Sequence, residues 1–267
     1  MVPQIEALTQ ALERVQQIQP VVHAITNWVT AGDVANVLNA VGARPVLAFA
    51  MEEVTEIVAK ADALMLNLGT PTPERVNAMI MAGRHANTLG KPLILDPVGA
   101  GASGFRKEAV RRILAELRVS VIKGNQAEVG ALAGMGGELR GVEAVRGPGD
   151  LLAAAGGLSR QTGAIIAVTG KHDLVVGRGQ TVTVENGHPL MGKMTGTGCM
   201  LAAVIAAFTA VEKDSMTATV AALTCFGLAG ERAGERASGP GTFKAALIDS
   251  LFMLRPADLR AGAKIRG

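Results

Sequence analysis

The glycine-rich turn Thr195-Gly196-Thr197-Gly198-Cys199 is the segment best placed to do chemistry. It opens directly into an apolar run over residues 199–211, which predicts a buried helix. The unpaired N–H groups at the start of a helix, together with the helix dipole, attract anions. Gly196 and Gly198 would let a substrate oxygen or a phosphoryl group approach the backbone closely. The alternative that stays open is a capped buried helix with a tight entry.

Cys199 is the nucleophilic side chain of this turn. A thiol at a helix N-terminus has a lowered pKa and gains thiolate character. A purely structural cap would more simply be Ser, Thr or Asp. We therefore predict Gly196, Gly198 and Cys199 as the catalytic turn, and we expect the other cysteine, Cys225, to be plain core.

Two acidic residues follow neighbouring predicted strands. Asp96 ends one of them, and Glu128 lies one turn into the helix that follows the next. Ligands bind at the carboxyl ends of strands in open α/β sheets, and two carboxylates with water can hold Mg²⁺. Asn125 with Glu128 three residues later is also close to a capping box, so a structural role stays open. The four histidines show no metal-ligand spacing.

The common nucleotide-binding motifs do not fit. Residues 99–104 match G-x-G-x-x-G, but Asp96-Pro97-Val98 separates them from the strand, and no ribose-binding acid ends the next strand. His172 follows Gly170-Lys171, so the Walker A pattern is absent. A nucleotide would be held another way, and Lys123 and Thr169 end two further strands at the same rim.

The elements that position these residues are predicted by hydrophobic patterning. Continuous apolar runs indicate strands buried on both faces, and helical patterns between them indicate βαβ crossovers in a mostly parallel sheet. An antiparallel edge hairpin over 174–185 is followed by three helices. The predicted strands are 21–26, 45–49, 63–67, 92–96, 120–123 and 164–169, and the predicted helices 33–41, 52–59, 73–89, 105–117, 126–133, 149–161, 199–211, 216–230 and 241–254.

Composition narrows the class of protein. The chain has 267 residues, 49% of them apolar, which fits a single α/β domain over 1–267. The net charge is +3, and the only dense basic group lies on the helix at 105–117, where Phe105 and Ala109 are expected inward and Arg106 on a solvated face. Nucleic acid is therefore not an expected partner.

The 2 cysteines suit a reducing cytoplasm, and the longest apolar run falls short of the ~20 residues of a membrane helix. Residues 134–149 are expected to form a loop.

Across nearly the whole chain the sequence resembles the hydroxyethylthiazole kinases, which are ribokinase-like enzymes. The resemblance rests on these segments: His-Ala-Ile-Thr-Asn at 23–27, Glu-Glu-Val at 52–54, Leu-Asn-Leu-Gly-Thr at 66–70, Asp-Pro-Val-Gly-Ala-Gly at 96–101, Val-Ile-Lys-Gly-Asn at 121–125 with Glu128, Val-Thr-Gly-Lys at 168–171, Glu-Asn-Gly-His at 185–188, and Thr-Gly-Thr-Gly-Cys at 195–199.

The resemblance implies a three-layer fold, ATP as co-substrate, Mg²⁺ as cofactor, and the hydroxyethyl arm of a thiazole as phosphoryl acceptor. It also implies a homotrimer whose pockets lie between subunits. The implied site residues are Lys123, Thr169 and Asn125 at ATP, Asp96 and Glu128 at the metal, and Asn27, Leu47 and Gly196 at the alcohol. Members of the family commonly carry Met at the position of Leu47, which is a similar side chain in volume. They commonly carry Arg at the position of Lys123, and a lysine there keeps the charge but cannot make the bidentate phosphate contact of an arginine.

Two other functions compete with the kinase. Nucleotide-dependent dehydratases that repair hydrated nicotinamide cofactors are also ribokinase-like, but they usually carry Asp where this chain has Cys199. The missing Asp also leaves open a non-catalytic protein that binds thiazole or nucleotide. A thiolate would be an imperfect replacement for the Asp base, so slow turnover is expected.

Overall fold

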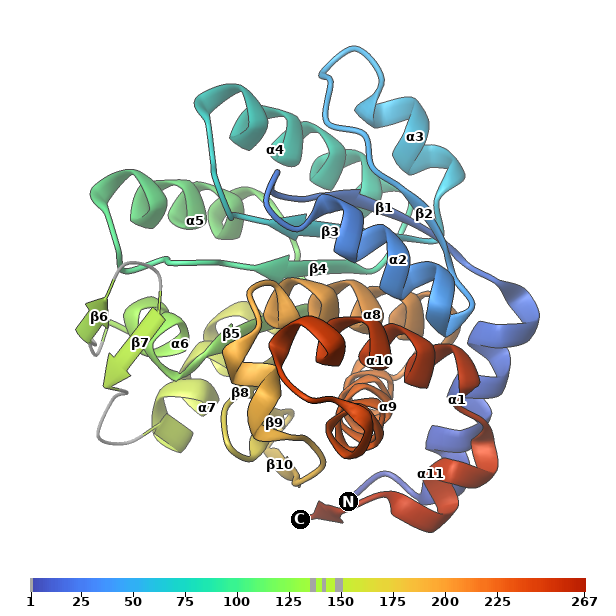
Figure 1. Cartoon of the computed structure of the whole chain (residues 1–267). Coiled ribbons are helices and arrows are strands. Elements are labelled where there is room, and N and C mark those ends of the chain that lie inside the picture. The colour runs from blue at the N-terminus through green and yellow to red at the C-terminus, as the bar shows by residue number, and fades with distance from the viewer. Residues whose placement is uncertain (1, 135–137, 141–142, 147–150) are drawn as a thin grey trace.

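A central sheet of nine strands organises the computed structural model, which describes residues 2–134, 138–140, 143–146 and 151–267 (Figure 1). The strand order is β11-β10-β9-β8-β5-β4-β3-β1-β2, and the strands from β8 to β2 in this order are parallel. Strands β9, β10 and β11 continue the sheet antiparallel. The bounds are β1 (Val21–Ile25), β2 (Arg44–Val46), β3 (Ala63–Asn67), β4 (Leu93–Asp96), β5 (Val121–Asn125), β8 (Ile165–Thr169), β9 (Asp173–Gly177), β10 (Gln180–Val184) and β11 (Ile265–Arg266).

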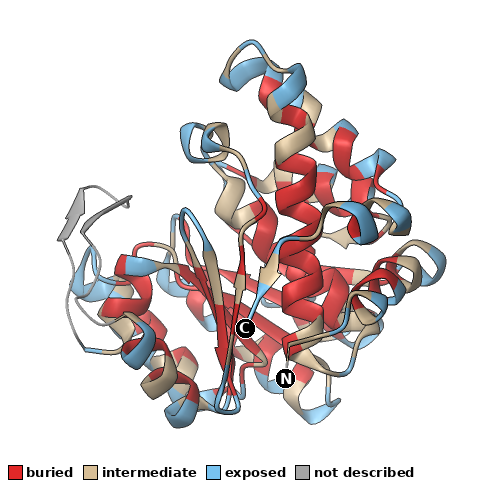
Figure 2. Cartoon of the chain, turned by 90° about the horizontal axis from the view of Figure 1, so that it is seen from below, coloured by how far each residue is buried: buried red, intermediate tan, exposed pale blue. Residues whose placement is uncertain are grey.

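Helices cover both faces of the sheet and make two separate hydrophobic cores. Alternate residues of one strand serve different cores: Ala63 and Met65 of β3 pack with one, and Leu64 and Leu66 with the other. Figure 2 shows the buried residues concentrated in the sheet and the helices against it. The first core lies under α1 (Ile5–Ile18), α2 (Ala31–Val41), α8 (Thr197–Val211), α9 (Ser215–Arg236), α10 (Pro240–Met253) and α11 (Pro256–Gly262), and the second under α3 (Val54–Lys60), α4 (Pro73–Thr88), α5 (Gly104–Glu116), α6 (Gln126–Leu132) and α7 (Leu151–Thr162).

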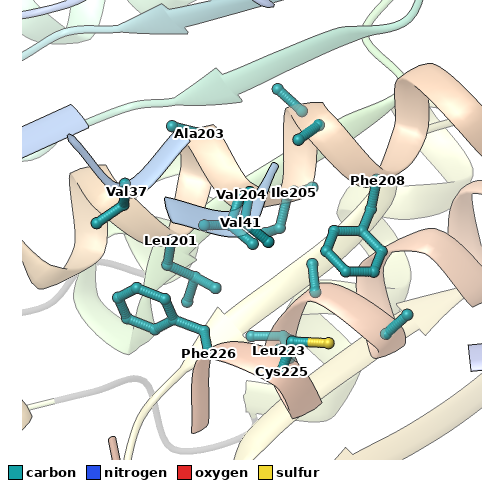
Figure 3. Packing of buried hydrophobic residues seen from close by; sticks show 14 of the residues in the cluster. Val37, Val41, Leu201, Ala203, Val204, Ile205, Phe208, Leu223, Cys225 and Phe226 are labelled. Carbon is teal, nitrogen blue, oxygen red and sulfur yellow. The ribbon is translucent and has the colours of Figure 1, made fainter. Parts of the chain in front are cut away.

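Helix α8 is deeply enclosed in the first core, since all its residues from Met200 to Thr209 are buried. Leu201 of α8 packs against Phe226 of α9, and Cys225 lies in the same core, as expected (Figure 3). Such a helix, apolar all round, is held rigidly between the sheet and other helices. Its first turn is therefore a fixed platform for the site.

The three-layer architecture is confirmed, and so is the hairpin, formed by β9 and β10. The hairpin is not the outermost element, because the short strand β11 pairs with β10 outside it. Neither α11 nor β11 was predicted. In the described part of 134–149 the loop prediction is wrong, because β6 (Glu138–Arg140) and β7 (Glu143–Arg146) pair as an antiparallel two-stranded sheet.

Two smaller predictions also need correction. The strand expected over 45–49 is only β2, and Phe49 lies beyond it with 38% of its surface exposed. On α5 Ala109 is buried as expected, but Phe105, in the first turn of the helix, is 45% exposed. Arg106 was expected on a solvated face, but its guanidinium donates hydrogen bonds to two backbone carbonyls. Among the described residues, no helix is both long and apolar enough to cross a membrane.

Candidate active site

Three buried polar side chains meet where the central parallel strands end. Asn67 is the last residue of β3 and lies opposite Asp96, the last residue of β4, in the strand pairing. The Nδ2 of Asn67 donates to Oδ2 of Asp96 at 2.6 Å, and the Nζ of Lys123 on β5 donates to Oδ1 at 3.3 Å. All three residues are at most 4% exposed. The last residues of β3 and β4 therefore lie in one row with Lys123, an amide and a carboxylate beside an ammonium. Lys123 was expected to end its strand, but β5 continues two residues further to Asn125.

The charges of Asp96 and Lys123 influence each other's pKa. Burial raises the pKa of Asp96 to about 6, although the ammonium of Lys123 opposes the rise. Burial alone would lower the pKa of Lys123, but the charges of Asp96 and Glu128 outweigh it and raise that pKa. Lys123 is thus a charged side chain at neutral pH, and Asp96 is the main group that balances it.

The capping-box interpretation of Asn125 and Glu128 is confirmed. The Oδ1 of Asn125 accepts the N–H of Glu128 at 2.9 Å, and Oε2 of Glu128 accepts the N–H of Asn125 at 2.8 Å. Oε1 of Glu128 also accepts the N–H of Gly99 at 2.9 Å, which ties the loop after β4 to α6. The cap does not exclude a second role, because each carboxylate oxygen has a further lone pair. Glu128 lies close enough to Asp96 for its charge to raise that pKa.

The first turn of α8 has no side-chain cap. Gly196 is the N-cap residue with φ of 96°, and its position makes no side-chain cap hydrogen bond. The hydroxyl of Thr197 turns back to the carbonyl of Met191 at 2.7 Å. The capped-helix alternative is therefore not observed, and the N–H groups of the first turn are not covered by a side chain of their own cap.

Both glycines of the turn are close-packed against named side chains. A Cβ at Gly198 would lie 2.8 Å from the Nζ of Lys123, so the ammonium lies directly against the start of α8. A Cβ at Gly196 would lie 2.6 Å from Cγ2 of Thr30. Gly198 thus gives Lys123 access to the helix N-terminus, and Gly196 has a structural need for glycine whatever binds there.

The expected low pKa of Cys199 is wrong. Burial raises the pKa of the Cys199 thiol above its usual value, and the charge of Asp96 raises it further, while Lys123 opposes them. The Sγ accepts from Nδ2 of Asn27 at 3.5 Å. Sequence alone could place the thiol at a helix N-terminus but could not show that it is enclosed, and burial outweighs the favourable dipole.

Of the two residues predicted at the alcohol, Asn27 bonds to the buried polar side chains and Leu47 does not. Asn27, which is 4% exposed, donates from Nδ2 to Oδ1 of Asn67 at 2.8 Å and so joins the row of polar side chains. Leu47 follows β2 and packs, half-buried, against the core on the α8 side. None of the hydrogen bonds described above places Leu47 in the polar row, so its role at a substrate stays a prediction.

A cavity of about 720 Å³ opens beside the start of α8. Its size is in the range of small-molecule and cofactor sites. Thr169 and Gly198 line it, so the structure brings the end of β8 and the α8 turn to one space. The Oγ1 of Thr169 donates to the carbonyl of Gly124 at 3.4 Å. Asp173, also in the lining, has its pKa raised to about 6 by burial.

Sequence reasoning missed two residues that hold the site together. Asn67 had a signal, since it is a polar residue at the end of an otherwise apolar strand. Arg106 donates to the carbonyls of Leu68 at 2.5 Å and Val98 at 2.6 Å, which binds together the loops after β3 and β4. Only the fold brings those loops to α5. Within the described residues no cluster of three His, Cys, Asp or Glu could hold a metal ion.

Comparison with known proteins identifies the family. The model of the hydroxyethylthiazole kinase family matches residues 12–257. A hydroxyethylthiazole kinase from Chloroflexus aggregans is 50% identical over 260 residues, which are 97% of this chain and 94% of that protein. The chain belongs to the hydroxyethylthiazole kinase family. A family member from Methanosphaerula palustris is 48% identical over 97% of this chain and 98% of its own length.

Solved structures agree with this assignment. The hydroxyethylthiazole kinase protein from Pyrococcus horikoshii OT3 is 42% identical, covers 98% of both chains and superposes with a TM-score of 0.89. An ADP complex of Bacillus subtilis pyridoxal kinase is 16% identical, covers 78% of this chain and 90% of its own, and has a TM-score of 0.57. The second likeness concerns the fold alone, which is the ribokinase-like fold that the sequence resemblance implied.

Proposed function

We propose that this member of the hydroxyethylthiazole kinase family transfers the γ-phosphoryl group of ATP to the hydroxyl of hydroxyethylthiazole, in the salvage of the thiazole half of thiamine. The observation that carries the proposal is the ammonium of Lys123, fixed by Asp96 and lying against Gly198 at the open start of α8. An ammonium and helix N–H groups together form a site for a phosphoryl group.

The nucleotide would occupy the 720 Å³ cavity beside α8. Thr169 and Gly198 line that cavity, and Lys123, which does not itself line it, lies against Gly198; we infer that phosphates bound at this end of the cavity would approach both the helix start and the ammonium. We assign Lys123 and Thr169 to the phosphates, and Asn125, which begins α6 after β5, to the nucleotide beside them. In this proposal the nucleotide would be held in the cavity without the common glycine-rich motifs.

The acidic residues fit Mg²⁺. Asp96, Glu128 and Lys123 together carry a net charge of −1, and each carboxylate has lone pairs beyond its hydrogen bonds. We infer that Asp96 and Glu128 hold the ion, with water and phosphate oxygens as the remaining ligands. A bound Mg²⁺ supplies charge neutralisation at the phosphates. Lys123 supplies the same kind of stabilisation from the protein.

The transfer requires the alcohol oxygen to attack the γ-phosphorus in line with the leaving oxygen. One O–P bond forms, the bond from the γ-phosphorus to the bridging oxygen breaks, and ADP leaves while the alcohol proton passes to solvent or to a nearby base. Since the thiol of Cys199 is mostly protonated at neutral pH, it contributes little as that base. Positioning and electrostatic stabilisation therefore supply most of the acceleration.

The alcohol is proposed to bind at Asn27, Leu47 and Gly196. A homotrimer with pockets between subunits follows from the family resemblance, and an exposed apolar patch beside Asn27 supports it. This patch, hereafter the Trp28 patch, consists of Trp28, Val29, Phe49 and Met51, which are 62, 65, 38 and 39% exposed. Patches of this kind mark interaction surfaces. A cytoplasmic location stays a prediction.

A coupled assay of ADP release tests the proposed function. We expect release from ATP and Mg²⁺ only when hydroxyethylthiazole is added, with chelation of the metal stopping the reaction. Release of phosphate without the alcohol would indicate a different nucleotide-dependent reaction. Tight binding of the alcohol and ATP without any release of ADP would contradict the kinase and support a binding protein.

A further inference from the structure

Asn67 is a fully buried side chain to which the proposed reaction assigns no role. Its exposed fraction is 0%, although the four residues before it in β3 are apolar. A polar side chain in such a place destabilises the fold unless it is fully hydrogen-bonded. Asn67 bonds to two side chains that the proposed function uses, one on the alcohol side and one on the phosphate side.

The hydrogen bonds of Asn67 fix the orientation of its amide. Its Oδ1 accepts from the N–H of Gly69 at 3.0 Å and from Nδ2 of Asn27 at 2.8 Å. Its Nδ2 donates to Oδ2 of Asp96 at 2.6 Å. The reversed amide would place its oxygen against a carboxylate and its NH₂ against a backbone N–H. One orientation alone satisfies all three partners.

The row of bonds extends on both sides of Asn67. On one side Nδ2 of Asn27 also reaches Sγ of Cys199 at 3.5 Å, in the first turn of α8. On the other side Asp96 accepts from Lys123, which lies against Gly198 in the same turn. The row of side chains therefore connects to the first turn of α8 at both of its ends. Asn27 contacts Cys199 at one end, Lys123 lies against Gly198 at the other, and Asn67 is in the middle.

Asn27 has little freedom to move when Asn67 holds it. A Cβ at Gly69 would lie 2.7 Å from Cβ and from Nδ2 of Asn27, so the backbone of the loop after β3 packs directly against this side chain. Oδ1 of Asn27 also accepts the N–H of Thr30 at 3.0 Å. Packing from Gly69 and the bond from Asn67 together leave the amide of Asn27 in one place.

We propose that Asn67 is a positioning residue that holds Asn27 and Asp96 at a fixed separation, so that the alcohol side and the phosphate side of the site stay aligned. The inference rests on the proposed function for the identity of the two sides. Asn67 itself touches neither the alcohol nor the nucleotide in this assignment, and it does not line the 720 Å³ cavity.

Two substitutions separate the bonds of Asn67. Asn67→Leu removes all of them at similar volume. Asn67→Asp keeps an oxygen for Asn27 and Gly69 but turns an acceptor toward Asp96. Ser159→Ala is the matched control, because it deletes a buried hydrogen bond of 2.7 Å to the carbonyl of Ala164, at the opposite end of β8 from Thr169.

Steady-state kinetics and ADP binding give the first readout. We expect Asn67→Leu to lower kcat and to raise the KM for the alcohol, each at least tenfold. We expect Asn67→Asp to lower kcat at least tenfold with the alcohol KM within threefold of wild type. ADP affinity, measured by calorimetry, should stay within threefold in both. Wild-type values of kcat and KM in the variants would overturn the proposal, and so would a loss of ADP affinity as large as the loss of kcat. If Asn67→Leu fails to fold, Asn67→Asp decides the question.

Alkylation of Cys199 by iodoacetamide gives a readout that needs no turnover, and Cys225 is fully buried and should not react. Amide N–H groups favour the thiolate, so we expect Asn67→Leu to slow alkylation at least threefold and Ser159→Ala to leave it unchanged. An unchanged or faster rate in Asn67→Leu overturns the positioning role. If wild-type enzyme releases no ADP with the alcohol, the proposed function fails, and the alkylation rates still decide the role of Asn67.

Discussion

At the residue scale, the site depends on where burial places each polar group more than on the group's chemical type. Cys199 is the clearest case, because the same thiol would be reactive at an exposed helix N-terminus and is mostly protonated here. Lys123 is the opposite case, since a buried ammonium keeps its charge only because Asp96 and Glu128 lie near it. The turn therefore acts mainly through the charge of Lys123 and the backbone N–H groups, and the thiol of Cys199 contributes less.

Replacing the thiol tests this ranking. We expect Cys199→Ala to retain at least about a tenth of the wild-type kcat, because a base adds at most ~10²–10⁴-fold and a protonated thiol is a poor one. Cys199→Asp should keep or raise kcat, since a carboxylate is a better base. Initial rates of ADP release give both values. A folded Cys199→Asp enzyme that binds substrate and is inactive would contradict this expectation.

A methyl group at Gly198 tests the contact with Lys123. Its Cβ would lie 2.8 Å from Nζ, the far end of a flexible side chain, so the lysine should move and the fold should persist. We expect kcat to fall at least tenfold with little change in Tm, because losing one preorganised charge contact costs about that much or more.

Gly192→Ala is the control for this substitution, because a Cβ there meets nothing within 4 Å although the residue lines the same cavity. Equal activity of the two alanine variants would remove the case for Lys123 at the transferred group. Gly196→Val, which would block approach of the alcohol, is less informative. Its φ of 96° and the closeness of Thr30 make any side chain there a source of strain.

At the element scale, α6 begins with a residue to which both a structural and a functional role are assigned. Asn125 caps the helix through its bond to the N–H of Glu128. We expect Asn125→Ala to lower the free energy of unfolding by about 1 kcal/mol and Asn125→Asp to leave it nearly unchanged, because Asp caps equally well. Denaturant unfolding measures both.

The same pair of variants tests the nucleotide role of Asn125. If its side-chain amide contacts ATP, the KM for ATP rises in both variants, although only one has lost its cap. An increase confined to Asn125→Ala would trace the effect to a disordered start of α6 and leave Asn125 without a direct contact.

Much of the element arrangement could be predicted because the strands are continuous apolar runs. The strand over 63–67 and the buried helix that begins near Cys199 are correct to within two residues. Strand β11 could not be predicted, because two residues carry no periodicity, and Lys264 and Asn186 position it through long-range bonds. The site was predicted in part: Asp96 and Lys123 are joined as expected of neighbouring strand ends, but the partners of Asn67 follow only from strand pairing.

At the scale of the whole molecule, the Trp28 patch bears on assembly. Trp28 contacts Phe49 edge to face, with ring centroids 4.8 Å apart, and the guanidinium of Arg75 lies 4.2 Å from the Trp28 ring centroid. The patch is therefore ordered by contacts within the chain while one side of it stays exposed. A rigid apolar surface loses little conformational entropy when a second copy covers it.

Sedimentation tests this assembly. We expect wild-type protein at three times the mass of the chain, and Trp28→Lys at the mass of one chain, because a charge in the patch would be buried without a partner. Phe252→Lys on α10 is the control, since Phe252 is 65% exposed but lies outside the patch. A monomeric wild type, or dissociation by both substitutions alike, would refute the proposed interface.

The pairing of Asn67 with Asp96 has a consequence for how the sheet assembles. The strands β3 and β4 are buried on both faces, so the burial of apolar side chains hardly distinguishes the native alignment from one displaced by a single residue. The displaced alignment would place Asn67 beside Leu95 and break its hydrogen bond to Asp96, which would leave the Nδ2 of Asn67 without this acceptor in the interior. Selection for phosphoryl transfer would then also preserve correct folding, and loss of Asn67 should increase misaligned, aggregation-prone chains.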